Sequence, residues 1–169
     1  MASSTTQNES NDAPAAPQPY TIQGANHTGF TVTNIDRSID FWHKKLQLPL
    51  LYSIVLDGDM ISEVTGVEKA KVALAMVMLP NGHGIELLEY RNDAENATYK
   101  PKSCDVGSVH IALNVQGLDA LVDSVNSEGW ARVGKTQTIE GGVLDGTRVV
   151  YIRGPDGETV ELMESPLPN

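Results

Sequence analysis

The sequence predicts an α+β fold made of two copies of one module, each running strand, helix and then three strands. The first observation is an internal repeat, in which PNGHGIELLE at 80–89 returns as PDGETVELME at 155–164. The second is that HTGFTVTNIDRSID at 27–40 matches HIALNVQGLDALVD at 110–123. Two blocks repeated in the same order indicate a duplicated unit, and such repeats must be recognised before single motifs are interpreted.

Composition limits the classes of protein to consider. A chain of 169 residues can form one compact domain or two small half-domains that share a core. The net charge of −10 argues against a nucleic-acid partner, because phosphate binding needs clustered Lys and Arg. No apolar run approaches the roughly 18 residues that a membrane span requires. Cys104 is the single cysteine, which excludes an intrachain disulfide and a Cys-based zinc site, so we expect a cytoplasmic protein.

We expect four segments along the chain. Residues 1–22 should be a disordered tail, because they are rich in Ser, Thr, Asn, Ala and Pro and lack both basic residues and the apolar core of a secretory signal. Residues 24–91 form the first module and residues 106–165 the second. The polar stretch at 92–105 is the linker between them.

The first module should begin with a strand at 25–33 that ends at Asn34. Asn34 suits the N-cap of a helix, because its side-chain oxygen can accept a hydrogen bond from a free backbone N–H group. Asp36 would then lie in the first turn, where the helix dipole favours a negative charge. Apolar residues continue at helical spacing, at Ile35, Ile39, Trp42 and Leu46.

Three strands should follow this helix, at 49–57, 70–79 and 83–91. A Pro-Asn-Gly turn at 80–82 separates the last two. The segment 57–66 has no counterpart of equal length in the second copy. We expect it to be a loop or a short helix at the rim of a cavity.

The second module repeats this pattern. Its apolar helical positions are Leu118, Val122 and Val125. Gly129 should end that helix, since glycine readily adopts the left-handed conformation found after a helix C-terminus. The later strands are expected at 131–138, 146–153 and 158–164, the last two separated by a Pro-Asp-Gly turn at 155–157.

Each copy places a His in its first strand and a Glu in its last strand. A buried carboxylate without a partner costs several kcal/mol, and a metal cation would provide that partner. Two neutral imidazoles and two carboxylates would balance a divalent ion and leave one or two octahedral positions open. The four candidate metal ligands are His27, Glu86, His110 and Glu161.

Strand alternation decides between the two Glu residues of each copy. Glu86 and Glu89 point to opposite faces, as do Glu161 and Glu164, so only one of each pair can face a shared cavity. The second Glu lies nearer the strand end, where water reaches it more easily, which favours Glu86 and Glu161 as ligands. Glu89 and Glu164 should therefore be solvated, with a role as a base in the cavity as the alternative.

These residues give the chain a resemblance to the vicinal oxygen chelate superfamily, which includes glyoxalase I, methylmalonyl-CoA epimerase, extradiol dioxygenases and bleomycin- and fosfomycin-resistance proteins. The resemblance covers residues 25–165 and is carried by NHTGFTVTNIDRSIDFW, GIELLEY, VGSVHIALNV and YIRGPDGETVELME. It implies paired βαβββ modules that form a cupped eight-stranded mixed sheet around one metal ion. Gly154 departs from the family pattern, since many members have Asp before the Pro-Asp-Gly turn, and we expect little consequence at a turn position.

The resemblance places the same four residues in the family's ligand positions, and this ligand set separates the family's reactions. Extradiol dioxygenases use two His and one Glu, whereas Glu86 supplies a fourth ligand here. This favours a divalent-metal-dependent lyase or isomerase of the glyoxalase or epimerase type, which acts on a small oxygenated substrate through a metal-bound enediolate. The metal would be Ni, Co, Mn, Zn or Fe. Glu161 is the first candidate for the base and Glu86 the second.

Two other functions stay open. One is a ring-cleaving dioxygenase of the extradiol type that uses ferrous iron. The other is a protein that sequesters an aromatic or apolar compound without chemistry, although sequestering relatives typically lack the ligand residues. The resemblance also implies a homodimer, and leaves open whether each site is built within one chain or between two.

Overall fold

The structure is a computed structural model that describes residues 19–167 except for 93–95, 99, 127–129 and 131. Most of the tail expected at 1–22 lies outside these residues. Residues 20–26 lead into the first strand without regular secondary structure.

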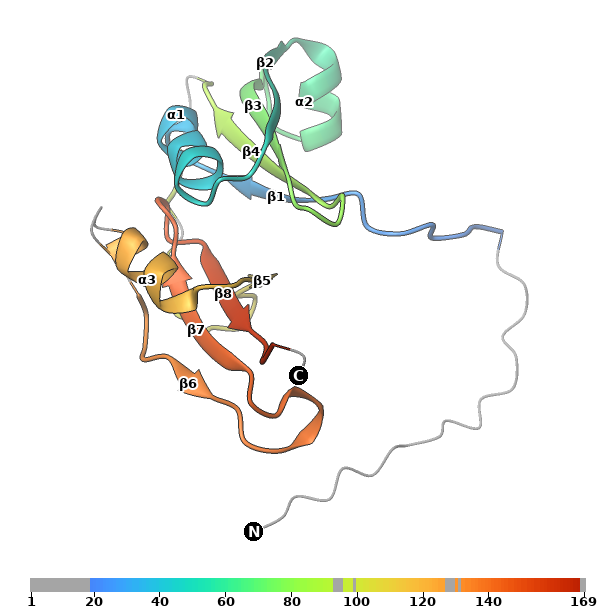
Figure 1. Ribbon diagram of the computed structural model, residues 1–169. Coiled ribbons are helices and arrows are strands. Elements are labelled where there is room, and N and C mark those ends of the chain that lie inside the picture. The colour runs from blue at the N-terminus through green and yellow to red at the C-terminus, as the bar shows by residue number, and fades with distance from the viewer. Residues whose placement is uncertain (1–18, 93–95, 99, 127–129, 131, 168–169) are drawn as a thin grey trace.

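The first half of the chain forms a four-stranded sheet with three helical segments (Figure 1). In chain order its elements are β1 (His27–Thr31), α1 (Ile35–Ile39), the π-helical η1 (Asp40–Lys45), β2 (Leu50–Asp57), α2 (Asp59–Thr65), β3 (Lys71–Met78) and β4 (Gly84–Tyr90). The strand order is β1-β4-β3-β2. β1 runs parallel to β4, and the other neighbours are antiparallel.

The second half repeats this topology. Its elements are β5 (His110–Asn114), α3 (Leu118–Asn126), β6 (Gln137–Thr138), the 3-10 helix η2 (Gly142–Leu144), β7 (Arg148–Arg153) and β8 (Thr159–Glu164). The order β5-β8-β7-β6, with β5 parallel to β8, is that of the first sheet. The α+β class and the paired modules are therefore confirmed.

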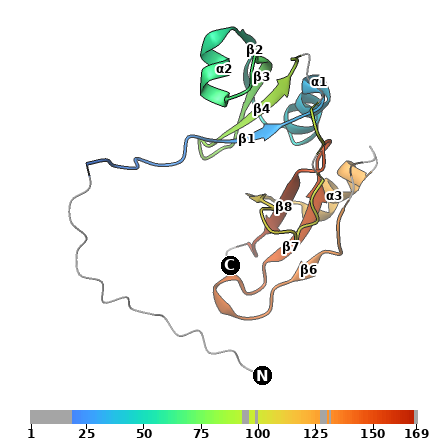
Figure 2. The same ribbon diagram turned by 180° about the vertical axis from the view of Figure 1, so that it is seen from behind.

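The eight strands are divided between two four-stranded mixed sheets, one in each module. The modules share a core on the side of their helices, where α1 and α3 lie next to each other in both views (Figures 1 and 2). The ring of Phe41 meets that of Trp130 edge to face, with 4.9 Å between the centroids. The sheet faces that carry the candidate ligands point away from this core.

The first helix begins where the sequence predicts. The side chain of Asn34 accepts a hydrogen bond of 2.8 Å from the Arg37 N–H. Beyond Ile39 the helix widens, and the Leu46 N–H donates to the Phe41 carbonyl five residues earlier. Both Phe41 and Trp42 are consequently buried, although an α-helical stripe includes only the second of them.

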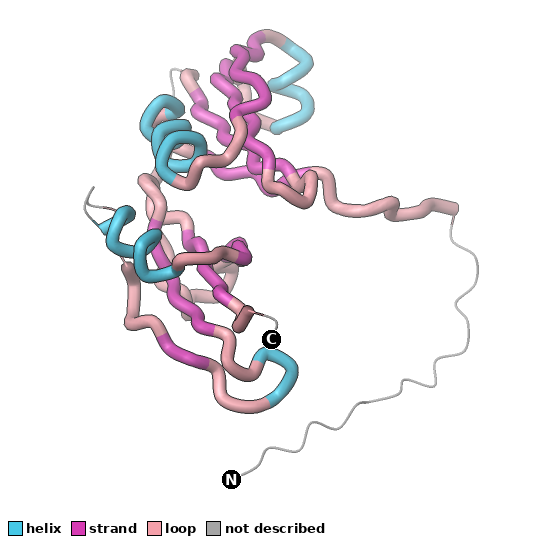
Figure 3. The backbone as a smooth tube through the Cα atoms, in the orientation of Figure 1, coloured by secondary structure: helices cyan, strands magenta, loops and turns pink. Residues whose placement is uncertain are grey.

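α2 confirms the short helix expected within 57–66. It ends at Gly66, which has a left-handed φ of 69°. Its Ile61 packs against Val72, in a cluster that also includes Leu88 and Tyr90. By strand alternation, Val72, Leu88 and Tyr90 share a sheet face with Glu86. α2 and α1 therefore flank opposite faces of the first sheet (Figure 3).

The long strand expected at 131–138 is wrong. Over the described residues 132–138, only β6 (Gln137–Thr138) and an isolated bridge between Arg132 and Ile152 form. Gly134 and the polar residues after it offer little side-chain packing to a strand, which weakens pairing at this sheet edge.

Candidate metal centre made of two half-sites

The structure places each candidate His beside the Glu of its own module. The Nε2 atom of His27 lies 3.3 Å from Oε2 of Glu86, and these two residues form the first half-site. The Nε2 atom of His110 lies 3.2 Å from Oε2 of Glu161, and these two form the second half-site.

Strand register explains why the two half-sites match. In the first sheet Gly29, two residues after His27, pairs with Glu86. In the second sheet Ala112, two residues after His110, pairs with Glu161. Residues two apart in a strand share a face, so each register brings the His and the Glu to the same side of their sheet.

The side chains of both half-sites are open to a ligand. The His27 and His110 side chains are 38% and 45% exposed, whereas those of Glu86 and Glu161 are 16% and 18% exposed. An imidazole nitrogen and a carboxylate oxygen are ligands that several divalent transition metals accept. The chemistry of the donors therefore fits a divalent metal ion.

The surroundings of the two His residues differ. Nδ1 of His27 lies 2.8 Å from Oδ1 of Asn26, and a proton donated there leaves the Nε2 lone pair free for a cation. His110 instead packs against Tyr151, with 5.2 Å between the ring centroids. Burial, together with the nearby charge of Glu161, raises the pKa of Tyr151, so its hydroxyl keeps its proton at neutral pH.

The residue opposite the Glu also differs between the half-sites. Tyr151 pairs with Glu161 across β7 and β8. At the matching position of the first sheet Met76 pairs with Glu86. The place of Tyr151 next to both second half-site residues could be inferred only from the strand register and from the packing of its ring.

The two half-sites do not meet within one chain. Over the part of the chain that the structure describes, no group of three or more His, Cys, Asp or Glu side chains is positioned to hold one metal ion. The four-ligand centre stays a prediction.

We expected Glu89 to be solvated, but its carboxylate caps a helix instead. Its Oε2 atom accepts a hydrogen bond of 3.0 Å from the Ile35 N–H at the start of α1. Arg91 donates to both carboxylate oxygens, and this hydrogen bonding is the main cause of the lowered pKa of Glu89.

Glu164 does the same in the second module. Its Oε1 atom accepts hydrogen bonds from the N–H groups of Gly117 and Leu118, at 2.6 and 3.0 Å. These two bonds lower the pKa of Glu164, and Arg148 pairs with its other oxygen at 2.9 Å. Both second Glu carboxylates are thus engaged at the start of a helix, and the repeated Glu-x-x-Glu spacing combines a candidate ligand with a helix cap.

Comparisons with known proteins identify the fold. The profile of the Glyoxalase/Bleomycin resistance protein/Dioxygenase superfamily matches residues 24–162. A 2-epi-5-epi-valiolone epimerase from Actinomyces sp is 30% identical over 144 residues, which are 83% of this chain and 78% of that protein.

Solved structures agree with this match. A glyoxalase family protein from Bacillus cereus superposes with a TM-score of 0.79 at 23% identity, covering 89% of this chain and 99% of its own. A glyoxalase I mutant from Zea mays superposes with a TM-score of 0.57 at 18% identity, over 82% of this chain and 44% of its own. Among the described residues no helix has the length and apolar character needed to cross a membrane.

Proposed function

Because the chain belongs to the Glyoxalase/Bleomycin resistance protein/Dioxygenase superfamily, we propose that it is a divalent-metal-dependent isomerase of the epimerase type. The observation that carries the proposal is the presence of two matching half-sites, each with an imidazole nitrogen beside a carboxylate oxygen. This donor set suits Ni, Co, Mn, Zn or Fe in the divalent state. The similarity to an epimerase favours inversion of a stereocentre over the lyase reaction.

The substrate is a small molecule with a carbonyl group next to a stereocentre that carries a proton. Removal of this proton makes the carbon planar, and return of a proton to the other face inverts the centre. The Actinomyces relative is named for valiolone, so a hydroxylated ketone of that kind is the first substrate to test.

The four residues of the two half-sites have separate roles. A bound divalent cation would supply Lewis acidity at the substrate carbonyl, which makes the neighbouring proton easier to remove. His27 and His110 would hold the cation, and Glu161 would take the proton, with Glu86 as the second candidate base. Tyr151 lies beside Glu161 and keeps its own proton, so its hydroxyl can donate a hydrogen bond to a substrate oxygen.

A homodimer completes the site. Each half-site lies on the face of its sheet that points away from the shared core, where a second copy can reach it. When the first half-site of one copy faces the second half-site of another, two-fold symmetry forms two such centres at once.

Proton exchange tests the function directly. Protein loaded with each of the five metals would be incubated with a hydroxylated ketone in D2O and followed by NMR. We expect deuterium at the carbon next to the carbonyl, together with the epimer and without oxygen consumption. The variant Glu161→Gln should lose this exchange, whereas Glu164→Gln, on the same strand but outside the half-site, should keep it.

Two outcomes would contradict the proposal. Oxygen consumption with ferrous iron and a ring-cleaved product would indicate a dioxygenase. Tight binding of an apolar compound by metal-free protein, without exchange for any metal, would indicate sequestration.

A further inference from the structure

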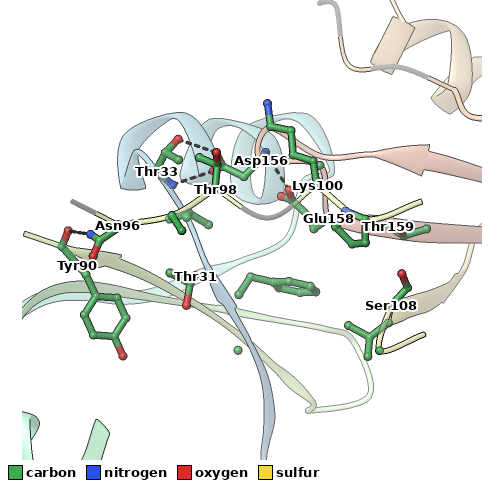
Figure 4. Close-up of a pocket in the computed structure, with 18 residues that line it drawn as sticks. Thr31, Thr33, Tyr90, Asn96, Thr98, Lys100, Ser108, Asp156, Glu158 and Thr159 are labelled. Atoms are coloured by element: carbon green, nitrogen blue, oxygen red, sulfur yellow. Dashed lines mark hydrogen bonds between the residues drawn. The ribbon is translucent and has the colours of Figure 1, made fainter. Parts of the chain in front are cut away.

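A cavity of about 520 Å³ lies between the two modules (Figure 4). Its walls are formed by residues 29–33, Tyr90, the linker residues 96–98 and 100–101, the segment 107–109 before β5, and the turn at 156–159. Cavities of this size hold small molecules in other proteins. The cavity is distinct from the two half-sites, since none of their four residues lines it.

The charged groups around the cavity do not offer an unpaired charge to a ligand. Both carboxylate oxygens of Asp156 are occupied by Thr33, through its N–H at 3.0 Å and its hydroxyl at 2.5 Å. The ammonium group of Lys100 points away from the cavity (Figure 4). In this arrangement neither group directs a free charge into the cavity.

The carboxyl group of Glu158 is also not available to a ligand. One carboxyl oxygen accepts a hydrogen bond of 2.9 Å from the Asp156 N–H, and the other is buried out of contact with solvent. Burial is the main cause of the raised pKa of the Glu158 carboxyl. Gly154 makes room for this carboxyl group, because a Cβ atom at that position would collide with it. The departure from the family pattern at Gly154 therefore has a consequence, contrary to expectation.

Uncharged polar groups remain free on the walls. The hydroxyls of Thr31 and Thr98 have no hydrogen-bond partner within the described parts of the chain. The amide of Asn96 donates to the Tyr90 carbonyl, which leaves its side-chain oxygen as an acceptor. Phe30 adds an apolar surface to the same space. Such walls suit an uncharged ligand that carries several hydroxyl groups.

The cavity adjoins the first half-site at Gly29, which has no side chain. Gly29 lines the cavity and is the cross-strand neighbour of Glu86. A Cβ atom at Gly29 would lie 3.6 Å from Oε2 of Glu86. Only the width of one small side chain therefore separates the cavity wall from that carboxylate.

We propose that this cavity binds the non-reacting part of a neutral, hydroxylated small molecule whose reacting carbon lies at the neighbouring half-site. The assignment of that ligand as substrate rests on the proposed function, whereas binding in the cavity requires no cation. The two can therefore fail separately.

Binding to metal-free protein tests the proposal. Cyclic polyols such as inositol, hydroxylated ketones and the singly phosphorylated form of each would be titrated in the presence of a chelator and followed by ligand-observed NMR. The variant Ala97→Trp would fill the cavity from an exposed wall residue. The matched control Ala120→Trp places the same bulk on an exposed position of α3, outside the cavity.

We expect neutral polyols or ketones to bind wild-type protein and Ala120→Trp equally. Ala97→Trp should weaken their binding at least tenfold, and the double variant Thr31→Val with Thr98→Val should weaken it several-fold. The proposal is overturned if no neutral ligand binds, if Ala97→Trp binds like the control, or if the phosphorylated forms bind more tightly. Retained cavity binding without any metal-dependent exchange would overturn only the proposed function.

Discussion

The two modules share a strand register and differ in what surrounds it. In both, the Glu of the half-site pairs with the residue two positions after the His. In the first module β3 pairs with β2, which has eight residues, whereas in the second module β7 pairs with β6, which has two. Duplication has thus kept the backbone that positions ligands, while the edges of the sheets have diverged.

The matching turns also differ in their partners. In the first module Asn81 accepts a hydrogen bond from the His83 N–H within its own turn. In the second module Asp156 reaches across to Thr33 at the end of β1. The same turn position therefore stabilises one module locally and joins the two modules in the other.

The largest effect should come from removing a His of either half-site. We expect His27→Ala and His110→Ala each to lower metal affinity by more than about 100-fold, beyond the loss typical of an outer-shell partner. Elemental analysis after dialysis against a fixed metal concentration measures this. Full metal content in either variant would contradict the equal roles of the two modules.

A smaller effect should appear when the orientation of only one His is disturbed. Asn26→Ala removes the partner of His27 Nδ1, and we expect about a tenfold loss of metal affinity. The second module has Val109 at the matching position, so Val109→Ala is the control and should leave metal affinity unchanged. Equal losses in the two variants would show that the asymmetry around the His residues has no role.

A larger residue at Gly154, which lies against Glu158, should lower the stability of the fold. Gly154→Ala forces a Cβ atom against Glu158, and overpacking of this kind costs about 1–3 kcal/mol. Denaturant unfolding measures the change, and the double variant with Glu158→Ala relieves the collision. A cost that is the same in the presence and absence of the Glu158 side chain would refute the contact.

The smallest effect concerns the helix caps. Glu164 caps α3, where Gly117 has no side chain that could do so. At α1, Glu89 caps the helix together with Asn34. Glu164→Gln should therefore lower the melting temperature more than Glu89→Gln. The pKa of each carboxyl is lowered in the folded chain. Each carboxylate therefore stabilises the fold above its ordinary pKa of 4.5, and this contribution is lost as pH falls through the lowered value.

Thermal melts of the variants across pH test that sign. The difference between wild-type protein and Glu164→Gln should shrink from about pH 6 to about pH 3. A difference that grows on acidification would contradict the capping role.

The sequence alone predicts much of this organisation. The repeat gives the two modules, helical spacing gives the first helix with its Asn34 cap, and strand alternation distinguishes Glu86 from Glu89. Alternation tells which residues share a face but not what covers that face. The capping role of Glu89 therefore depends on how the helix crosses the sheet, which local spacing does not encode.

Other features depend on packing between the modules. Phe41 is buried because η1 is π-helical and packs against Trp130 of the other module. The separation into two sheets depends on which faces the shared core occupies. Neither follows from periodicity within one module.

Mixing two inactive variants tests the central claim most directly. His27→Ala and His110→Ala proteins would be combined, unfolded and refolded together, and native mass spectrometry would establish that mixed dimers had formed. If each centre joins half-sites from two copies, a mixed dimer holds one intact centre, and metal content should return to about a quarter of the wild-type value, because half of randomly formed dimers are mixed. Mixed dimers that remain free of metal and inactive would contradict a centre built between two chains.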